Sequence, residues 1–417
     1  MINQELRDKG SRAKEASRIL ASLSTDKKNN ILAAMAAALE EAELQILIEN
    51  ALDMTQAKEN GMSKALLDRL HLTPARIKDM ADGLRALVSL PDPIGGVESM
   101  WKGAQDIEIG RMRVPLGVIG IIYEARPNVT ADAAGLCLKT GNAVILRGGS
   151  DALNSNRIIT EVLAQAAEAA GAPAGSIQSI ENPDRDIVAQ LMKLNQYLDV
   201  LIPRGGAGLI QSVVLNATVP VIETGIGNCH IYVDSYADLK KAEEIIVNAK
   251  CQRPGVCNAA ENLLVHEKVA AEFLPKVCKR LRQAGVEIRG DQRTRDLVPD
   301  INEASEEDYG KEFLDLILAV KVVDNLEQAM AHIQKYGTGH SEAIVTEHYG
   351  HARTFLQGVD AAAVYANAST RFTDGFQFGF GAEIGISTQK LHTRGPMGLK
   401  ELTTIKYIIY GDGQIRK

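Results

Sequence analysis

Hydrophobic residues recur at helical spacing through the first part of the chain. The segment 31–54 is rich in Ala, Leu and Glu, and its apolar positions repeat every three to four residues, which predicts amphipathic helix. A further helix is predicted after Thr73, because Thr can cap a helix and Pro74 suits its first position. Pro91 and Pro93 then end the helical region. We therefore expect the chain to open with a block of helices.

Beyond this block the pattern changes to short apolar runs that alternate with amphipathic stretches such as 150–170 and 239–250. The runs expected to form β-strands are 114–123, 142–149, 198–206, 219–224, 229–234, 262–266, 318–323, 341–346 and 361–367. Strands that alternate with helices at this spacing are typical of parallel, doubly wound sheets. The sequence predicts an α/β fold with two such sheets. A β-rich tail from Leu402 either completes a sheet or offers an edge to a second subunit.

The composition limits the classes of protein to which the chain can belong. Its 417 residues exceed the usual size of a single core, so two or more domains are expected. Hydrophobic residues make up 45% and charged residues 24%, and a net charge of -7 gives no general attraction for nucleic acid or anionic lipid. The first residues lack the apolar core of a secretory signal, and no apolar run is long enough to span a membrane. We expect a cytoplasmic globular protein with no nucleic-acid or membrane partner.

Five cysteines are present, at positions 137, 229, 251, 257 and 278. An odd number at irregular spacing suits a reducing compartment and gives no CxxC pair for a metal, so no metal site is expected. Cys257 differs from the others because it follows a helix and a Pro-Gly turn, where backbone N–H groups can lower the pKa of a thiol. From these residues alone two interpretations stay open: a nucleophile, or a buried and inert core thiol.

Motifs on either side of Cys257 separate these two interpretations. The segment 114–149 runs from an apolar strand through a Pro-Asn pair to a helix and a second strand, and it resembles the corresponding stretch of aldehyde dehydrogenases. The segment 223–234 resembles the strand of the same superfamily that carries a glutamate. Glu223 precedes Cys257 by the separation that those enzymes use. Two motifs in the right order and register are far stronger than either alone.

Within that superfamily the chain is most similar to the γ-glutamyl phosphate reductases, and the resemblance covers essentially its whole length. The segments that carry it are IYEARPNVT (122–130), ILRGGSDALNSN (145–156), IPRGG (202–206), QRPGVCNA (252–259), YGTGHSEAIVT (336–346) and the block 367–399. Aldehyde dehydrogenases in general lack the His-Ser-Glu sequence and the long C-terminal block. The resemblance implies an aldehyde-dehydrogenase-like fold. It also implies an NADPH-dependent reduction of L-glutamyl 5-phosphate to L-glutamate 5-semialdehyde and phosphate, the second step of proline biosynthesis from glutamate.

For catalysis, the resemblance implies a thioester on Cys257. An acyl phosphate is already activated, so a thiolate can displace the phosphate and a hydride donor can then reduce the thioester. Asn128 matches the asparagine that donates to the oxyanion in this superfamily, although a residue after Pro127 is also a usual turn position. Glu223 matches the glutamate that activates water in hydrolytic members. Because a reductase must avoid that water, a direct role for Glu223 is left open.

For the cofactor, the resemblance implies NADPH. The residues that it assigns to cofactor binding are Arg147, Gly148, Gly149, Ser150, Arg204, Gly205, Gly206 and Glu312. Ser150 stands where aldehyde dehydrogenases carry a glutamate that binds the ribose of NAD and would repel a 2′-phosphate, and Arg147 adds positive charge nearby. The Arg-Gly-Gly turn matches the turn that faces the pyrophosphate, and Glu312 matches the glutamate that holds the nicotinamide ribose. Each glycine taken alone is equally compatible with a common turn.

The substrate carries an α-carboxylate, an α-ammonium group and a phosphate, so cationic and hydroxyl groups should converge near the nucleophile. The candidates are first Ser369, Thr370 and Arg371, and second His340, Ser341 and Glu342. An exposed surface loop is the alternative interpretation of RFTDG (371–375), the segment that begins at Arg371.

The resemblance also implies a division into three parts. An NADP-binding domain takes residues 1–98 and 118–226, a catalytic domain takes 227–395, and an oligomerisation hairpin and tail take 99–117 and 396–417. A homo-oligomer is therefore expected, while contact with a glutamate 5-kinase that passes on its labile product is left open. Two other functions are compatible with these residues. They are an oxidising semialdehyde dehydrogenase, which product analysis would separate, and a catalytically silent relative that serves as a scaffold.

Overall fold

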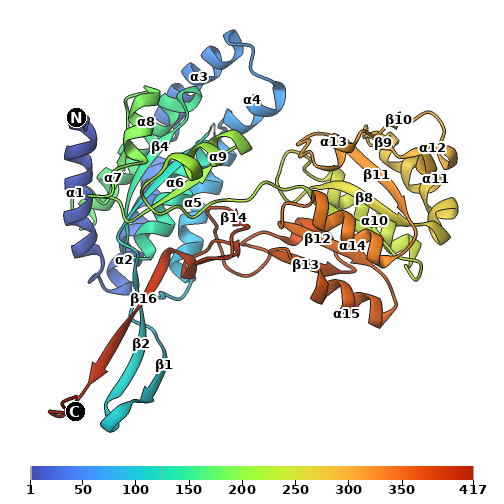
Figure 1. The fold of residues 1–417 in the computed structure, drawn as a ribbon. Helices are drawn as coiled ribbons and strands as arrows, with labels where there is room; N and C mark the ends of the chain where they lie inside the picture. Colours follow the sequence, from blue (N-terminus) through green and yellow to red (C-terminus); the bar gives the residue numbers. More distant parts are fainter. Residues whose placement is uncertain (1, 125, 417) are drawn as a thin grey trace. The chain divides into compact units, whose positions relative to one another are not determined.

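In the computed structural model, the chain folds into two compact units (Figure 1). The structure describes residues 2–124 and 126–416. The first unit is made of Met1–Thr224, Gly379–Gly385 and Met397–Lys417, and the second of Gly225–Phe378 and Ile386–Pro396. The first unit is therefore assembled from both ends of the chain.

Helices open the first unit, as the hydrophobic pattern predicts. They are α1 (Gln4–Leu20), α2 (Thr25–Glu41), α3 (Glu43–Glu59), α4 (Lys64–Leu70) and α5 (Pro74–Ser89). Thr73 caps α5, because its side chain accepts a hydrogen bond from the backbone N–H of Arg76, and Pro74 takes the first helical position. The apolar faces of α1, α2, α3 and α5 join one hydrophobic core with the sheet of this unit, while α4 packs in a smaller cluster with Ala57 and Ala152.

The core of the first unit contains a parallel sheet in the order β5-β4-β3-β6. Its elements are β3 (Val118–Tyr123), α6 (Asn128–Lys139), β4 (Ala143–Gly148), α7 (Leu153–Ala169), β5 (Ile177–Ser179), α8 (Arg185–Leu191), β6 (Val200–Arg204) and α9 (Ala207–Asn216). The chain starts in the middle at β3, moves outward through β4 and β5, and returns to the other side of β3. The carboxyl ends of β3 and β6 therefore form a topological switch point, where ligands bind in folds of this kind.

Two predicted strands differ from the structure. The run 114–123 is interrupted at Gly117, whose φ of 125° lies in a region that residues with a side chain avoid. This run therefore supplies the end of β2 (Glu108–Pro115) and all of β3. The run 219–224 is not a strand, because it makes only an isolated bridge between Val221 and Leu201. Pro220 lacks the N–H group that a longer ladder would need.

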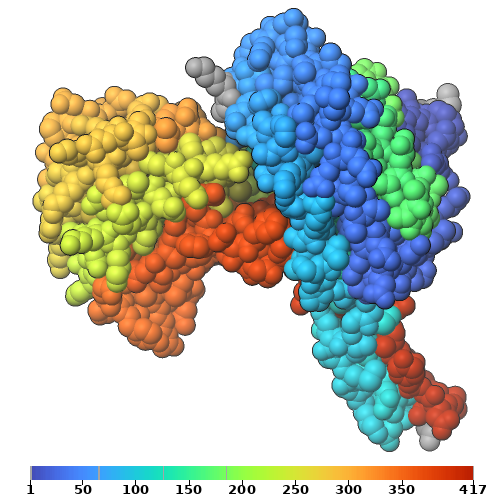
Figure 2. Space-filling view, turned by 180° about the vertical axis from the view of Figure 1, so that it is seen from behind, coloured from blue at the N-terminus to red at the C-terminus, as the bar shows by residue number. Residues whose placement is uncertain are grey.

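An antiparallel sheet extends from the first unit as an arm, which can be followed in both views (Figure 2). It pairs β1 (Val97–Lys102) with β2, and β2 with β16 (Thr403–Tyr410). Trp101 and Tyr407 meet edge to face on this sheet, with ring centroids 6.2 Å apart. Tyr407 and Ile409 are exposed on β16, which forms one edge of the sheet. An edge strand with exposed apolar side chains is open to pairing with another chain.

The second unit is built on a larger parallel sheet in the order β10-β9-β11-β8-β7-β12-β13. Its strands are β7 (Cys229–Val233), β8 (Ala260–His266), β9 (Glu287–Gly290), β10 (Asn302–Glu303), β11 (Ile317–Val323), β12 (Ser341–Val345) and β13 (Ala363–Ala366). Its helices are α10 (Leu239–Cys251), α11 (Glu267–Gln283), α12 (Gln292–Leu297), α13 (Glu306–Tyr309), α14 (Leu326–Tyr336) and α15 (Tyr349–Gly358). Helices α10 and α11 pack on one face of the sheet, and α14 and α15 pack on the other. The prediction of a doubly wound parallel sheet is confirmed.

Short elements complete the two units. They are the 3-10 helices η1 (Ala104–Asp106), η2 (Ser150–Ala152), η3 (Thr370–Phe372) and η4 (Lys400–Leu402), and the paired strands β14 (Ile386–Ser387) and β15 (Gly395–Pro396). Within residues 2–124 and 126–416, no helix is long and apolar enough to cross a membrane. The same residues contain no group of three or more His, Cys, Asp or Glu side chains that could hold a metal ion.

Asp53 on α3 fixes the start of α7. Its carboxylate accepts hydrogen bonds from the backbone N–H groups of Asn154 (3.2 Å) and Ser155 (2.8 Å), and from the side chains of the same two residues. Asp53 is 4% exposed. A buried carboxylate at this position satisfies N–H groups that the helix leaves unpaired, and its charge suits the positive end of the helix dipole. The residue therefore couples α3 to the first turn of α7.

We predict that Asp53→Ala lowers the free energy of unfolding by about 2–4 kcal/mol, because it leaves buried donors unpaired. Denaturant unfolding followed by circular dichroism measures the change. Asp26→Ala is the control, since Asp26 is exposed in the first turn of α2 and should change stability by less than about 0.5 kcal/mol. Equal stability of the two variants would show that the Asp53 contacts contribute nothing.

Candidate active site

Cys257 lies in the loop between α10 and β8, at the amino-terminal edge of the sheet of the second unit. The thiol-bearing residue is half-buried. The loops that lead into β7, β11 and β12 (225–228, 311–316 and 337–340) lie at the same edge, because parallel strands all begin on one side of a sheet. The site around Cys257 is therefore made of loops that precede strands. Ligand sites in doubly wound sheets usually lie at the opposite, carboxyl edge.

Gly227 packs against the backbone of Cys257 so closely that no side chain would fit between them. A Cβ atom on Gly227 would lie 1.5 Å from the carbonyl oxygen of Cys257 and 2.6 Å from its Cα. Both of these are backbone atoms, so no change of rotamer could relieve the overlap. Glycine is required at this position because two loops meet there backbone to backbone.

Side chains from neighbouring loops hold the segment that carries Gly227. The backbone N–H of Gly227 donates to Oε1 of Glu312 at 2.8 Å. Thr338 donates its hydroxyl to the carbonyl oxygen of Ile226 at 2.5 Å and accepts the backbone N–H of Asn228 at 3.1 Å. Glu312 was assigned to the nicotinamide ribose from the sequence. In the structure one of its carboxylate oxygens supports the Gly227 loop.

Cys229, the first residue of β7, supports Cys257 from inside the unit. Its thiol donates to the carbonyl oxygen of Cys257 at 3.1 Å and lies 3.7 Å from Nδ1 of His340. Burial raises the pKa of the Cys229 thiol well above its usual range, so this thiol stays protonated and can donate. Burial also raises the pKa of three further thiols, those of Cys137, Cys251 and Cys278.

Arg371 and Thr370 tie the Cys257 loop to η3. The guanidinium of Arg371 donates to Oδ1 of Asn258 and, at 2.9 Å, to Oε1 of Gln252. These two partners lie on either side of Cys257 in the loop. The hydroxyl of Thr370 donates to the carbonyl oxygen of Asn258 at 2.7 Å. Burial lowers the pKa of Arg371, but a guanidinium stays protonated at neutral pH, so Arg371 brings positive charge to the loop.

The segment 369–371 is not an exposed surface loop. Ser369 is 5% exposed and Thr370 is fully buried, and the hydroxyl of Ser369 accepts the backbone N–H of Arg371 at 3.3 Å. Arg371 itself is half-buried. The structure therefore brings Arg371 to the Cys257 loop, while Ser369 and Thr370 hold the backbone that carries it.

His340, Ser341 and Glu342 are all fully buried. Nδ1 of His340 lies 2.8 Å from the hydroxyl of Ser341, which in turn bonds to Thr373 at 2.7 Å. Oε2 of Glu342 accepts the backbone N–H of His230 at 2.7 Å and lies 3.0 Å from its ring Nδ1. These side chains form a polar network inside the second unit. The structure buries all three at the start of β12, and their contact with substrate stays a prediction.

Asn128 is the first residue of α6 in the first unit, and it is exposed. Its Nδ2 donates to Oδ2 of Asp132, one helical turn later, at 3.2 Å. Burial raises the pKa of Asp132 to about 6, against the lowering effect of the Asn128 bond. An amide nitrogen carries two hydrogens, so the bond to Asp132 orients the amide and leaves a second hydrogen to donate. Ala125, in the same motif, lies outside the described residues.

Glu223 is half-buried near the end of the longest segment of the first unit. The segment that carries it runs beside β6, since the backbone N–H of Ile222 donates to the carbonyl oxygen of Leu201 at 2.9 Å. The hydroxyl of Thr224 donates a hydrogen bond to the carbonyl oxygen of Pro203, also at 2.9 Å. The backbone around Glu223 is thus well fixed, and its chemical role stays a prediction.

At the switch point of the first unit, residues 204–206 lead into α9. The backbone N–H of Gly206 donates to Oε2 of Glu124 at 2.9 Å, so a carboxylate oxygen lies at the N-terminal end of α9. A Cβ atom on Gly205 would lie 2.6 Å from the carboxyl carbon of Glu124. Helix N-termini bind anionic oxygens through such N–H groups. A phosphate oxygen of a cofactor suits the same donor.

Arg147, predicted to offer its charge to the cofactor, is 6% exposed at the end of β4. Its guanidinium donates to the carbonyl oxygens of Gly148 and, at 2.9 Å, of Pro183. Burial lowers its pKa. The guanidinium binds the chain's own carbonyl groups, and its role toward the cofactor stays a prediction. Ser150, by contrast, is exposed at the start of η2.

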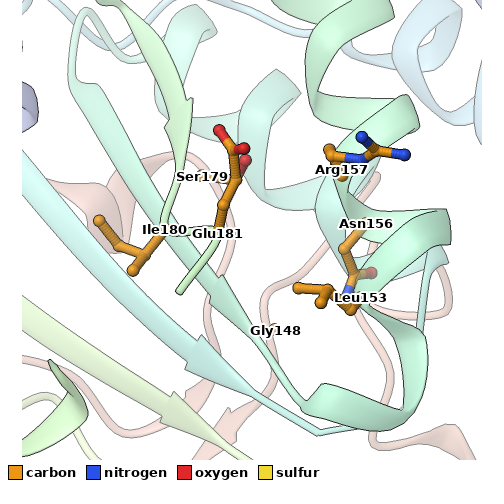
Figure 3. A pocket seen from close by; sticks show the side chains of 7 residues that line it. All are labelled: Gly148, Leu153, Asn156, Arg157, Ser179, Ile180 and Glu181. Carbon is orange, nitrogen blue, oxygen red and sulfur yellow. The ribbon is translucent and has the colours of Figure 1, made fainter. Parts of the chain in front are cut away.

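A small surface pocket lies beside the carboxyl ends of β4 and β5 (Figure 3). Its lining residues are Gly148, Leu153, Asn156, Arg157, Ser179, Ile180 and Glu181. Figure 3 shows the side chains of α7 on one side of the pocket and those at the end of β5 on the other. The pocket therefore lies at the edge of the sheet where nucleotides bind in doubly wound folds.

Two donors in this pocket fit a ligand with hydroxyl and phosphate groups. Nδ2 of Asn156 is buried and has no hydrogen-bond partner among the described residues, while its Oδ1 accepts from Thr130 at 3.2 Å. Arg157 has a side chain that is 42% exposed and lies 3.3 Å from Glu49. Sequence reasoning missed both residues. Asn156 ends one of the matched motifs, but only the packing of α7 beside β5 shows that it lines a pocket.

Comparison with known proteins identifies the class. Residues 3–316 match the aldehyde dehydrogenase family. This match covers most of the chain, and the chain therefore belongs to that family. Enzymes of this family use nicotinamide cofactors.

Within the family the chain groups with the γ-glutamyl phosphate reductases. It is 66% identical over 416 residues to the γ-glutamyl phosphate reductase of Heliobacterium modesticaldum, with 100% of both chains covered. It is also 66% identical over 413 residues to that of Moorella thermoacetica, with 99% of both covered. The crystal structure of the γ-glutamyl phosphate reductase of Thermotoga maritima matches with a TM-score of 0.96 at 52% identity and covers 99% of this chain and 100% of that one. The predicted family and fold class are confirmed.

We predict that Gly227→Ala lowers turnover by at least about 10²-fold, because the added Cβ must push the Cys257 carbonyl aside and a displacement of about 1 Å can have such an effect. Steady-state kinetics measures the loss. The control is Gly310→Ala in the same unit, where an added Cβ would have no neighbour closer than 3.8 Å. Near-native turnover of the Gly227 variant would show that the two loops can separate without consequence.

Proposed function

We propose that this chain reduces L-glutamyl 5-phosphate to L-glutamate 5-semialdehyde with NADPH, through a thioester on Cys257. The observation that carries the proposal is the fixed presentation of one half-buried thiol, with Gly227 against its backbone and Arg371 clamped across its loop. The relatives named γ-glutamyl phosphate reductase supply the substrate. The reaction is the second step of proline biosynthesis from glutamate.

In the first step the Cys257 thiolate attacks the acyl carbon of the substrate. The bond from that carbon to the phosphate oxygen breaks, inorganic phosphate leaves, and a thioester forms. Burial disfavours the thiolate form of the other four cysteines, which supports Cys257 as the proposed nucleophile. The guanidinium of Arg371 beside the loop suits the α-carboxylate or the phosphate of the substrate. Ser369 and Thr370 hold the backbone of that segment.

In the second step the thioester carbonyl is reduced. The nicotinamide supplies the hydride when it is bound. Negative charge develops on the carbonyl oxygen in both steps, and we propose that the side-chain amide of Asn128 donates to that oxygen. Collapse of the tetrahedral adduct expels the Cys257 thiolate and releases the aldehyde. Glu223 is proposed to shape the site without activating water, because hydrolysis of the thioester would waste the substrate.

We propose that the first unit binds NADPH at the carboxyl edge of its sheet. The backbone at residues 148–150 and 204–206 would face the diphosphate and the adenosine, and Glu312 the nicotinamide ribose. Ser150 gives no negative charge to repel a 2′-phosphate. Arg157 is a better candidate than Arg147 for binding that phosphate, since its side chain is 42% exposed in the pocket. The unpartnered amide hydrogens of Asn156 suit a ribose oxygen.

We further propose a cytoplasmic homo-oligomer that assembles through the arm. The free edge of β16 and the exposed side chains of Tyr407 and Ile409 favour contact with a second copy. Contact with a glutamate 5-kinase would shield the labile acyl phosphate from water.

Replacing Cys257 by Ser should lower turnover by at least about 10³-fold while the fold is kept, because no other thiol has this setting. Formation of glutamate semialdehyde, measured at matched protein concentration, is the readout. Cys251→Ala is the control from the end of the preceding helix and should keep most of the activity. An inactive Cys251 variant together with an active Cys257 variant would show that Cys251, and not Cys257, is the nucleophile.

Removing the guanidinium in Arg157→Ala should raise the KM for NADPH about 10–100-fold, as expected for a lost charged hydrogen bond of about 1.5–3 kcal/mol. The KM for NADH should change less than about twofold, since NADH lacks the 2′-phosphate. Kinetics with each cofactor tests this, with Arg18→Ala, exposed on α1, as the control. Equal use of both cofactors by the native protein would refute the preference for NADPH.

Loss of the proposed oxyanion donor in Asn128→Ala should lower kcat by about 10²–10³-fold with little change in KM, since the bond is made in the transition state. Asn128→Asp should be slower still, because a carboxylate cannot donate and its charge opposes the oxyanion. Near-native kcat in both variants would show that Asn128 is only a turn residue and does not donate to the oxyanion.

A further inference from the structure

A buried ion pair that the proposed reaction does not use lies in the second unit. Lys250 lies in the last turn of α10 and Glu261 lies in β8, so the pair brackets the Cys257 loop in the sequence. Both side chains are fully buried, and Nζ of Lys250 lies 2.6 Å from Oε2 of Glu261. Removing two charges from water opposes folding unless further hydrogen bonds compensate, and apolar residues of the same size would avoid that penalty. The other contacts of Lys250 and Glu261 therefore indicate the role of this ion pair.

The second carboxylate oxygen of Glu261 binds the backbone at a strained position. Oε1 accepts the N–H of Leu314 at 3.1 Å. Leu314 has a φ of 55°, in the left-handed region that a residue with a branched side chain avoids. Such a conformation persists only where its surroundings hold it. The bond from Leu314 to Glu261 is one contact that holds this bend.

The bend at Leu314 lies two residues after Glu312. Oε1 of Glu312 accepts the N–H of Gly227, and Gly227 packs on the carbonyl group of Cys257. A continuous set of contacts therefore runs from the buried ion pair to the nucleophile loop. Burial raises the pKa of Glu261 to about 7, and the charge of Lys250 acts against this rise. Lys250 thus helps to keep the carboxylate a strong acceptor.

We propose that Lys250 and Glu261 are positioning residues that fix the bend at Leu314 and thereby set Glu312 against the Gly227–Cys257 contact. The link from Glu312 to cofactor binding rests on the proposed function. The link from Glu261 to Gly227 rests only on contacts within the second unit. The same bend would set the carboxylate of Glu312 for the nicotinamide ribose, so one buried pair positions groups for both halves of the reaction.

Two double variants, Lys250→Met/Glu261→Gln and Lys250→Met/Glu261→Met, test this proposal. Both remove the two charges together and nearly keep the side-chain volumes, so neither leaves an unpaired buried charge. They differ in one respect: the side-chain oxygen of Gln can still accept the N–H of Leu314, whereas the sulfur of Met is only a weak acceptor. Amide hydrogen exchange at Gly227, measured by NMR or by overlapping peptides, reports whether Glu312 still holds that N–H.

We expect Gly227 to exchange at least tenfold faster in the Met variant than in the Gln variant, together with a higher KM for NADPH and a smaller change in kcat. Adding Leu314→Gly to the Met variant should slow the exchange again, because glycine adopts this φ without strain. In a Glu312→Ala background, where Gly227 has already lost its acceptor, the Met and Gln variants should exchange alike.

Equal exchange at Gly227 in the Met and Gln variants would overturn the proposal. So would failure of the Met variant to fold both with and without Leu314→Gly, since the pair would then serve stability alone. The control is the buried pair Lys28–Asp92 of the first unit, with an Nζ–Oδ2 distance of 2.5 Å. Lys28→Met/Asp92→Asn should leave the exchange at Gly227 unchanged. Because exchange needs neither substrate nor cofactor, it separates a failure of this proposal from a failure of the proposed function.

Discussion

Two loops of the second unit meet backbone to backbone at Gly227 and Cys257, and the rest of the candidate site is arranged around that contact. The space between them is too small for a single methyl group, so the chain must carry glycine on one side. The contact offers little side-chain packing of its own. Hydrogen bonds with the side chains of Glu312, Cys229 and Arg371 hold the two loops in place. The site is therefore rich in polar side chains whose role is to position the backbone.

The chemistry of the site depends on which thiol can ionise and which charges reach it. Burial keeps the thiol of Cys229 protonated, so that it donates to the carbonyl of Cys257. Arg371 holds its positive charge across the Cys257 loop through two side-chain oxygens. In the first unit the N-terminal end of α9 already takes a carboxylate oxygen from Glu124, which is the kind of group that a cofactor phosphate would replace.

The helices and the alternation of strands with helices could be predicted from the sequence, because they depend on local periodicity. The family could be predicted too, because its motifs have fixed spacing. The role of Cys257 as nucleophile stays a prediction. The sequence is a weaker guide to features that depend on tertiary packing, such as the direction in which a side chain points. Arg147 and His340 belong to matched motifs, yet packing turns both side chains inward, and no local pattern marks that. The strand expected over 219–224 does not form, because a strand needs a neighbouring strand to pair with and the local sequence does not show whether one is present. Arg157 was missed because its place in a pocket depends on α7 lying beside β5.

The proposed mechanism requires that Cys257 carries an acyl group that phosphate, and not water, removes. The direct test mixes the protein with glutamate semialdehyde and NADP⁺ in the absence of phosphate. We expect a burst of one NADPH per subunit and a thioester adduct on the Cys257 peptide, detected by mass spectrometry. Continued turnover should begin only when phosphate is added, with acyl phosphate as the product. Steady NADPH formation without phosphate, with glutamate as the product, would refute this mechanism and identify an oxidising semialdehyde dehydrogenase.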